Sequence, residues 1–395
     1  MKRTMLQPGS ALAHVRGQVA DLETENIALL AERARALEGV ITLWYGESDL
    51  VTPQFIRDAA KASLDAGETF YVPEMGGRPD LAQALARYQS SLHGREIATT
   101  RSTVAPGGMH SLFLGLELIL QTGDNAVYIE PQWPNIRHAI HLHGAEARPY
   151  SLEHRDGAWR LDLDALFDRC DARTRAIVFS TPANPTGWTA STDELAALLD
   201  FSRRTGVWIV SDEMYNRLYF DGACAPSIMA IAEDEDLVLC VNGFSKSWAM
   251  TGWRIGWLNH PASVAPAVRA MTQYMNSGTA PFVQAGALAA LEGGEDFVRT
   301  VVGRCRTGLD IAHDILGRSN RVVLSEPPKG GMYAFFSVDG EASAGELCMK
   351  ILNEARVGLA PGHMFGEASR QFIRMCVCND ESRIRTACER IAQAF

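Results

Sequence analysis

The stretch "NGFSKSWAMTGWRIGW", residues 242–257, contains a single lysine in surroundings that are unusual for a charged side chain. Lys246 is the only charged residue between Asp236 and Arg254, and it lies between two serines after a short apolar segment. Two interpretations are open. Lys246 is an ordinary solvated loop lysine, or its amine takes part in covalent chemistry, as lysine amines do with aldehydes.

Short apolar segments alternate with longer helical patterns on both sides of this stretch. The predicted strands cover residues 125–131, 175–182, 206–213, 237–246 and 254–258. The pattern over residues 191–205 predicts a helix that begins with a capping box formed by Ser191 and Glu194. Strands that are apolar on both faces and separated by helices predict an α/β fold, with a mostly parallel sheet and helices on both faces.

The two ends of the chain predict further elements. Residues 18–38 predict one helix, residues 283–316 are mostly helical, and residues 320–395 predict the strands and helices of a smaller α+β domain. We therefore expect an N-terminal arm with part of the small domain, a large domain and a small C-terminal domain. Their expected ranges are 1–45, 46–290 and 291–395, respectively.

Composition excludes several functional classes. The chain has 395 residues, of which 47% are apolar and 21% are charged, which is an ordinary globular balance. A net charge of -10 argues against non-specific binding to nucleic acid. The first 17 residues lack the apolar core of a secretory signal, and no run of 18 apolar residues occurs. These features predict a cytoplasmic location and neither membrane nor nucleic-acid partners.

Cysteine and histidine spacing does not indicate a metal site. The eight cysteines are irregularly spaced without a CxxC pair, which predicts reduced thiols. His138, His141 and His143 lie close in sequence, but no cysteine or carboxylate completes a ligand set. We expect no metal.

Polar residues follow the predicted strands at their carboxyl ends, where open α/β sheets bind ligands. These residues fall in segments 130–133, 184–187, 211–213 and 245–246, and they supply an aromatic ring, an amide, a carboxylate and an amine. We expect them to converge on one crevice.

Four of these motifs occur in an order that resembles a known family. They are "NPTG" (184–187), "SDEMY" (211–215), "FSKSWAMTGWRIGW" (244–257) and "FIRM" (372–375). The chain resembles the fold-type I, class I/II aminotransferases that use pyridoxal 5'-phosphate (PLP), the aspartate aminotransferase superfamily, over roughly residues 40–395. The resemblance implies a homodimer that moves an amino group from an L-amino acid to a 2-oxo acid through a Lys246 aldimine, which is a Schiff base.

The resemblance also implies roles for the strand-end residues. Lys246 would hold PLP and then move the substrate α-proton, and Asp212 would meet the pyridinium nitrogen. Tyr215 and Asn184 would bond the phenolic oxygen of the ring, and Trp133 would stack on the ring. Structural alternatives remain for these residues. Asp212 could cap a helix, Asn184 could serve a turn, and Tyr215 and Trp133 could be packed aromatics.

A further set of residues is implied for the phosphate group, because a helix start and a cation favour a dianion. The set contains the backbone amides of Gly108 and Met109, the side chains of Ser245 and Arg254, and Tyr71 from the neighbouring subunit.

Arg374 matches the family's arginine for the substrate carboxylate, and Gly46 and Asn184 match residues beside that carboxylate. The alternative for Arg374 is an internal ion pair. The segment 271–282, which the resemblance assigns to the partner's side of the substrate pocket, contains no arginine, and the nearest is Arg269. An aromatic rim would favour apolar or aromatic amino acids, with Trp44, Tyr45, Tyr274 and Tyr333 as its candidates.

Three other functions stay open. A lyase, cyclase or synthase that uses PLP on the same scaffold would keep Lys246, Asp212 and Arg374. A PLP-sensing or scaffold protein without catalysis would carry an added DNA-binding segment or lack the lysine, and the chain has neither sign. A nucleotide-binding α/β enzyme would have a G-x-G-x-x-G segment after its first strand, which is absent.

Overall fold

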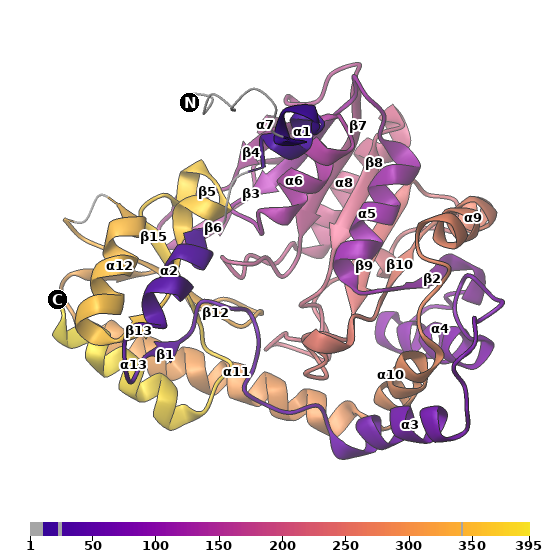
Figure 1. The fold of residues 1–395 in the computed structure, drawn as a ribbon. Helices are drawn as coiled ribbons and strands as arrows, with labels where there is room; N and C mark the ends of the chain where they lie inside the picture. The colour runs from indigo at the N-terminus through magenta and orange to yellow at the C-terminus, as the bar shows by residue number, and fades with distance from the viewer. Residues whose placement is uncertain (1–10, 23–25, 341–342) are drawn as a thin grey trace.

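The computed structural model describes residues 11–22, 26–340 and 343–395. Its centre is a seven-stranded sheet (Figure 1). The strands in spatial order are β2 (Ser102–Ala105), β10 (Gly256–Asn259), β9 (Val238–Gly243), β8 (Trp208–Asp212), β7 (Thr174–Ser180), β3 (Asn125–Glu130) and β4 (Glu146–Ser151). The strands from β9 to β4 pair in parallel, and β10 is antiparallel to both of its neighbours. The predicted α/β class with a mostly parallel sheet is confirmed.

Helices cover both faces of this sheet, as the apolar strands predict. On one face lie α5 (Gly108–Ile119), α6 (Asn135–Leu142) and α9 (Ala265–Met275), and on the other lies α8 (Thr192–Thr205). Ala176 and Val178 of β7 pack with the first group, whereas Ile177 packs with the second, because neighbouring strand residues point to opposite faces. The capping box of α8 is confirmed.

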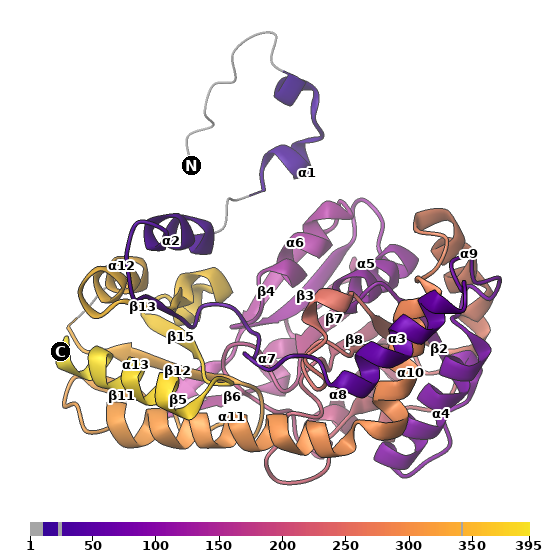
Figure 2. The same cartoon turned by 60° about the horizontal axis from the view of Figure 1, so that its bottom comes forward.

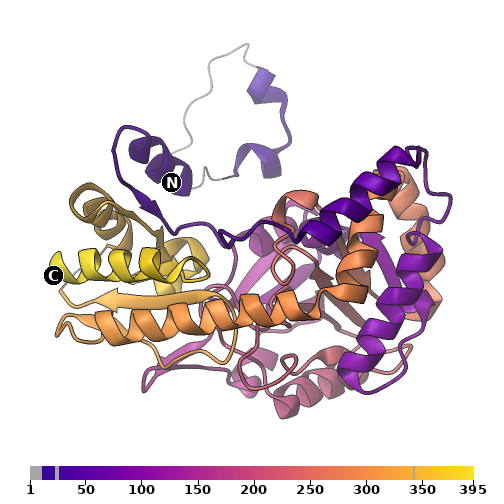
Figure 3. The same ribbon diagram turned by 90° about the horizontal axis from the view of Figure 1, so that it is seen from below.

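A helical layer lies beyond β2. It contains α3 (Gln54–Asp65), α4 (Pro79–His93) and α10 (Pro281–Gly293). The long helix α11 (Glu295–Leu316) follows α10 and runs across the molecule to its other end (Figure 3). The helical prediction for residues 283–316 is confirmed, with a break at Gly294, where a side chain would overlap Trp248.

The other end of the molecule contains a second, antiparallel sheet. Its strands are β11 (Val322–Leu324), β12 (Tyr333–Val338), β15 (Phe372–Cys376) and β14 (Ala360–Pro361), and α12 (Ala344–Ala355) and α13 (Glu381–Gln393) accompany it. Near the N-terminus, β1 (Ile41–Thr42) pairs in parallel with β13 (Val357–Gly358). The segment around β1 and the C-terminal helix α13 therefore lie at the same end of the molecule (Figure 2).

The prediction of one helix over residues 18–38 is wrong. The described residues form two separate helices, α1 (Gly17–Ala20) and α2 (Asn26–Ala34), and residues 23–25 lie outside the described part. Val19 and Leu22 are 40% and 39% exposed. The first half of the predicted apolar stripe therefore has no core to pack against, and packing supplies most of a helix's stability.

Shorter elements connect these layers. They are β5 (Glu153–Arg155), β6 (Ala158–Arg160), α7 (Leu163–Phe167) and the 3-10 helices η1 (Ala11–His14), η2 (Thr99–Arg101), η3 (Ile228–Ala230), η4 (Thr251–Trp253), η5 (Ala262–Val264), η6 (Gly362–Phe365) and η7 (Glu367–Ser369).

The eight cysteines are free thiols, as their spacing predicts. Within the described ranges, no helix is long and apolar enough to cross a membrane. The same part of the chain contains no group of three or more His, Cys, Asp or Glu side chains that could hold a metal ion.

Candidate active site

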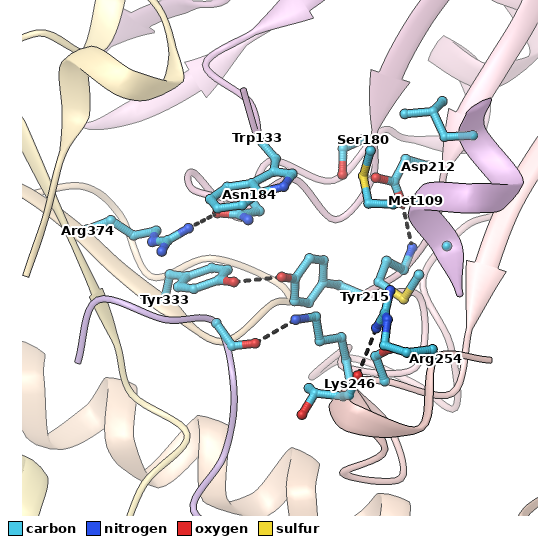
Figure 4. A pocket seen from close by; sticks show the side chains of 16 residues that line it. Met109, Trp133, Ser180, Asn184, Asp212, Tyr215, Lys246, Arg254, Tyr333 and Arg374 are labelled. Carbon is cyan, nitrogen blue, oxygen red and sulfur yellow. Dashed lines mark hydrogen bonds between the residues drawn. The ribbon is translucent and has the colours of Figure 1, made fainter. Parts of the chain in front are cut away.

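A cavity of about 180 Å³ lies beyond the carboxyl ends of β7, β8 and β9 (Figure 4). All the residues that the sequence assigned to cofactor or substrate line it, except Tyr71. The large sheet positions most of them, because the carboxyl ends of parallel strands meet at one edge. The small sheet adds Tyr333 from β12 and Arg374 from β15. The expected convergence on one crevice therefore exists.

Lys246 lies in the loop between β9 and β10, and its amine points into the cavity. Its Nζ donates a hydrogen bond to the carbonyl oxygen of Gly46 at 2.5 Å. Burial, and to a smaller extent the nearby positive charge of Arg374, lowers the pKa of Lys246 to about 8. The interpretation as a solvated loop lysine is therefore wrong. An amine with this pKa is partly neutral near neutral pH, which nucleophilic and basic chemistry requires.

Asp212 is the last residue of β8, and its carboxylate faces the same cavity. Its Oδ1 accepts a hydrogen bond from the backbone nitrogen of Met214 at 3.1 Å. No helix begins at this position, so the interpretation as a helix cap is wrong. Burial raises the pKa of Asp212 to about 6, although that hydrogen bond and the charge of Lys246 oppose the rise. A cation placed beside this carboxylate would stabilise its ionised form.

Arg374 is 1% exposed and has no carboxylate partner among the described residues. Its Nη1 donates to Oδ1 of Asn184 at 2.7 Å, its Nη2 donates to the carbonyl oxygen of Trp44, and its Nε is buried without a partner. The interpretation as an internal ion pair is therefore wrong. A buried guanidinium without a counter-ion is costly, so this site favours an anionic ligand.

Three aromatic rings surround the guanidinium of Arg374. The ring centroids of Trp133, Tyr333 and Phe365 lie 5.5, 4.5 and 4.7 Å from its Cζ. Such contacts attract the cation to the ring faces and keep the guanidinium plane in place. The cage explains how the side chain stays ordered without a carboxylate.

The opposite end of the cavity is suited to a phosphate. Helix α5 begins after Gly107, and the first amides of a helix have no intrahelical partner. A Cβ at Gly107 would lie 2.5 Å from Nη2 of Arg254, and φ at Gly107 is +90°. The bare glycine therefore leaves the helix start open beside a guanidinium, which is a site that binds dianions. Ser245 also lines this end of the cavity.

These observations test the fit of PLP, which the sequence resemblance implies. An amine, a buried carboxylate, a phenol and an anion-binding helix start lie around one cavity, and they match the aldehyde, ring nitrogen, phenolic oxygen and phosphate of PLP. The residues present fit the group.

Several residues that line the cavity were not predicted from the sequence. They are Leu112, Ser180, Met214 and Thr251. Ser180 carried a usable signal, because it is the polar residue that ends strand β7. Met214 carried no such signal, because its contact exists only in the folded chain. There its methyl group occupies the volume that a Cβ at Gly108 would need.

The expected aromatic rim is only partly present in the described chain. Tyr333 lines the cavity, whereas the ring of Trp44 is buried against Gly358 in the core. Tyr45 and Tyr274 are 50% and 85% exposed. Trp44 is therefore a core residue that contributes its carbonyl oxygen, and not its ring, to the site.

The fold and the cavity together define an α/β enzyme that uses PLP. The family model described as aminotransferase class I and II matches residues 38–391. The chain belongs to this family and is a PLP-dependent aminotransferase.

Known proteins resemble the chain over nearly its whole length. An aspartate aminotransferase of Geobacillus stearothermophilus is 30% identical over 386 residues, covering 95% of this chain and 97% of the relative. Aromatic-amino-acid aminotransferase 2 of Thermococcus litoralis is 29% identical over 374 residues, covering 93% and 95%. The solved structure of the aspartate aminotransferase from Rhizobium meliloti has a TM-score of 0.89 at 26% identity, covering 96% and 98%.

Proposed function

We propose that the cavity binds PLP and an α-amino acid side by side, with each lining residue in the role that its position suits. When bound, PLP supplies an aldehyde that reacts with amines and a ring that withdraws electrons. The residues of this chain bind and orient that group and move protons around it.

The proposed cofactor contacts follow the charges of the cavity. The phosphate end is held by Arg254, Ser245 and the amides of Gly108 and Met109, because a helix start and a guanidinium together favour a dianion. Asp212 holds a proton on the ring nitrogen, because a buried carboxylate is stabilised by a cation beside it.

The remaining contacts orient the ring. Tyr215 and Asn184 bind its phenolic oxygen, because both offer a side-chain donor at the cavity wall. Trp133 flanks the ring face.

Two basic side chains are proposed to contact different parts of the α-amino acid. Arg374 binds the carboxylate as a planar fork, and Gly46 lies beside it, where the absence of a side chain makes room for the Tyr333 hydroxyl. Lys246 removes the α-proton of the substrate and returns it at the other reacting carbon, acting as general base and then as general acid. The pKa of about 8 suits both directions of this transfer.

The observation that carries this proposal is the buried guanidinium of Arg374, which has no carboxylate partner among the described residues and lies in the same cavity as the amine of Lys246. We expect Arg374→Lys to lower kcat/KM by about tenfold or more for every amino acid, since lysine keeps the charge but loses the planar fork, and a hydrogen bond to a charged group contributes roughly 1.5–3 kcal/mol. The loss for a simple primary amine is expected to stay within about threefold, and steady-state kinetics on both substrates measure the difference.

Arg370→Lys is the matched control, because Arg370 is an exposed arginine near the same sheet that pairs with Glu367. Its kinetics are expected to equal those of the wild type. Equal losses for amine and amino acid in Arg374→Lys would mean that Arg374 serves the fold rather than the substrate.

For the substrate side chain we propose an apolar or aromatic amino acid. The cations that line the cavity within the described chain are Lys246, Arg254 and Arg374, and each already has a proposed role. No further cation is available there for a second carboxylate. The segment 271–282 also contains no arginine. The second candidate is aspartate, because several relatives are named aspartate aminotransferases.

A donor screen separates these two candidates. We expect kcat/KM for phenylalanine, leucine or methionine to exceed that for aspartate by at least about tenfold, which corresponds to 1.36 kcal/mol. The measurement is the change in cofactor absorbance when each amino acid is added to the loaded enzyme. A preference for aspartate of similar size would establish the second candidate instead.

The proposed enzyme is a cytoplasmic homodimer. Phe70 and Tyr71 are each 82% exposed, and exposed aromatic side chains in one segment favour a protein interface. In the dimer, Tyr71 would reach the phosphate of the neighbouring subunit, and segment 271–282 would border its substrate pocket.

We propose that the chain is divided into an N-terminal arm with part of the small domain (1–45), a large domain (46–290) and a small C-terminal domain (291–395).

A further inference from the structure

Two buried phenols share a hydrogen bond at the centre of the cavity (Figure 4). The hydroxyl oxygens of Tyr215 and Tyr333 are 2.6 Å apart, and their rings meet edge to face with centroids 5.7 Å apart. The two residues are 5% and 3% exposed, so little of either side chain is open to water. Tyr215 follows β8 of the large sheet, whereas Tyr333 begins β12 of the small sheet. The bond therefore joins the two sheets inside the site.

The hydroxyl of Tyr333 is held in place from several sides. The guanidinium of Arg374 lies over its ring at 4.5 Å from the centroid. Gly46 packs so closely against the hydroxyl that a Cβ at this position would overlap the Tyr333 oxygen. Loss of the Tyr333 hydroxyl would therefore leave a gap between Gly46 and Tyr215, while the ring could keep its contact with Arg374.

The number of protons decides which phenol donates. A hydroxyl has one proton and two lone pairs, so Tyr215 cannot give its proton both to Tyr333 and to a ligand oxygen. When an electron-rich oxygen accepts from Tyr215, the hydroxyl of Tyr333 has to be the donor in the bond between the phenols. Successive hydrogen bonds polarise one another, so this second bond makes Tyr215 a stronger donor.

We propose that Tyr333 is a positioning residue for the cofactor, whose hydroxyl donates to Tyr215 and directs the Tyr215 proton toward the phenolic oxygen of PLP. The inference rests on the proposed role of Tyr215 and goes beyond it, because it assigns the donor chain to a residue of the small sheet. Arg374 favours this direction, since a cation close to the Tyr333 ring makes its hydroxyl a better donor.

The phenols themselves do not titrate in the working pH range. Burial raises the pKa of Tyr333 to about 12, although Arg374 opposes the rise, and burial raises the pKa of Tyr215 well above its usual value. The other titratable or charged groups that face the pair are Lys246, Asp212 and Cys376, besides Cys305 at the Tyr333 side. A pH titration near neutrality therefore reports on the loaded cofactor and these neighbours, and not on loss of a phenol proton.

Tyr333→Phe tests the inference, because it deletes the hydroxyl and keeps the ring. The readout is the pH midpoint of the absorbance change of the bound cofactor. Its deprotonated form has more negative charge at the phenolic oxygen, so a weaker Tyr215 donor favours the protonated form. We expect the midpoint to rise by about half a pH unit or more, where one unit corresponds to 1.36 kcal/mol.

A double-mutant cycle makes the test specific. Tyr215→Phe is expected to raise the midpoint at least as much, and Tyr333→Phe is expected to add nothing in the Tyr215→Phe background, because the donor chain is already broken. Tyr88→Phe is the matched control, since it deletes a buried hydroxyl for which the described residues offer no hydrogen-bond partner. Its midpoint is expected to equal that of the wild type.

A second readout distinguishes the contact of Tyr333 with Tyr215 from its contact with Arg374. The Kd of 3-phenylpropionate, a carboxylate without an amine, is expected to stay within about twofold in Tyr333→Phe. Two results would overturn the inference while leaving the role of Tyr215 intact. One is an unchanged midpoint in Tyr333→Phe, whether or not the Kd is weakened, and the other is an equal shift in both backgrounds. An unchanged midpoint in Tyr215→Phe would instead overturn the proposed role of Tyr215, and the inference with it.

Discussion

Lys246→Ala is expected to abolish turnover and covalent attachment of PLP while the protein still binds PLP non-covalently. General acid–base catalysis alone contributes about 10²–10⁴-fold, and this variant also loses the amine that would react with the aldehyde. The phosphate contacts proposed for Arg254 and Ser245 stay intact, so equilibrium dialysis is expected to detect bound PLP. Borohydride reduction followed by mass spectrometry of the intact chain measures covalent attachment, which is expected to be absent.

Lys61→Ala is the control for this experiment, because Lys61 is an exposed lysine of α3 that pairs with Asp58 on the same helix. Reduction is expected to attach PLP to this variant as to the wild type, and peptide mapping is expected to locate the adduct at Lys246. A stable adduct at another lysine in Lys246→Ala would contradict the assignment. Loss of PLP binding would show instead that the amine is needed for affinity.

Asp212→Asn is expected to lower kcat by roughly 10³-fold, which corresponds to about 4 kcal/mol of transition-state stabilisation. Asparagine keeps the shape of the side chain and can still accept from Met214, but it has no charge to hold a proton on the ring nitrogen. The ring then withdraws electrons less strongly. Single-turnover kinetics with an amino-acid donor measure the loss in the chemical step, and PLP binding is expected to weaken much less.

The pKa of Asp212 predicts how the activity of the enzyme changes with pH. Burial places its pKa at about 6 in the protein without cofactor, and a neighbouring cation would lower that value. The carboxylate is therefore ionised at neutral pH, and activity that depends on it is lost as pH falls through its pKa. Asp200→Asn, an exposed change on α8, is the control and is expected to leave kcat unchanged. Near-normal turnover in Asp212→Asn would remove the proposed role of this carboxylate.

The sequence by itself determined the elements whose signals are local. The alternation of apolar strands with helical patterns predicted the mostly parallel sheet, and Ser191 with Glu194 predicted the start of α8, because capping depends on residues three apart. The same local information predicted polar groups at the ends of β7, β8 and β9. Parallel strands bring such ends to one edge, so Asn184, Asp212 and Lys246 could be grouped from the sequence.

The helix predicted over residues 18–38 marks a limit of that information. A periodic apolar pattern predicts a helix only if a core is present to pack against its apolar face. Val19 and Leu22 remain substantially exposed, and nothing in their neighbourhood along the chain indicated this.

Only the tertiary structure decided how the two sheets meet at the site. The bonds from Lys246 to Gly46, from Arg374 to Asn184 and between Tyr215 and Tyr333 join residues that are 200, 190 and 118 positions apart. Sequence motifs name these residues but do not give the burial that lowers the pKa of Lys246 or leaves Arg374 without a counter-ion. Burial, ion pairing and hydrogen bonding between distant residues exist only after the chain has folded, because each depends on which groups exclude water from the others.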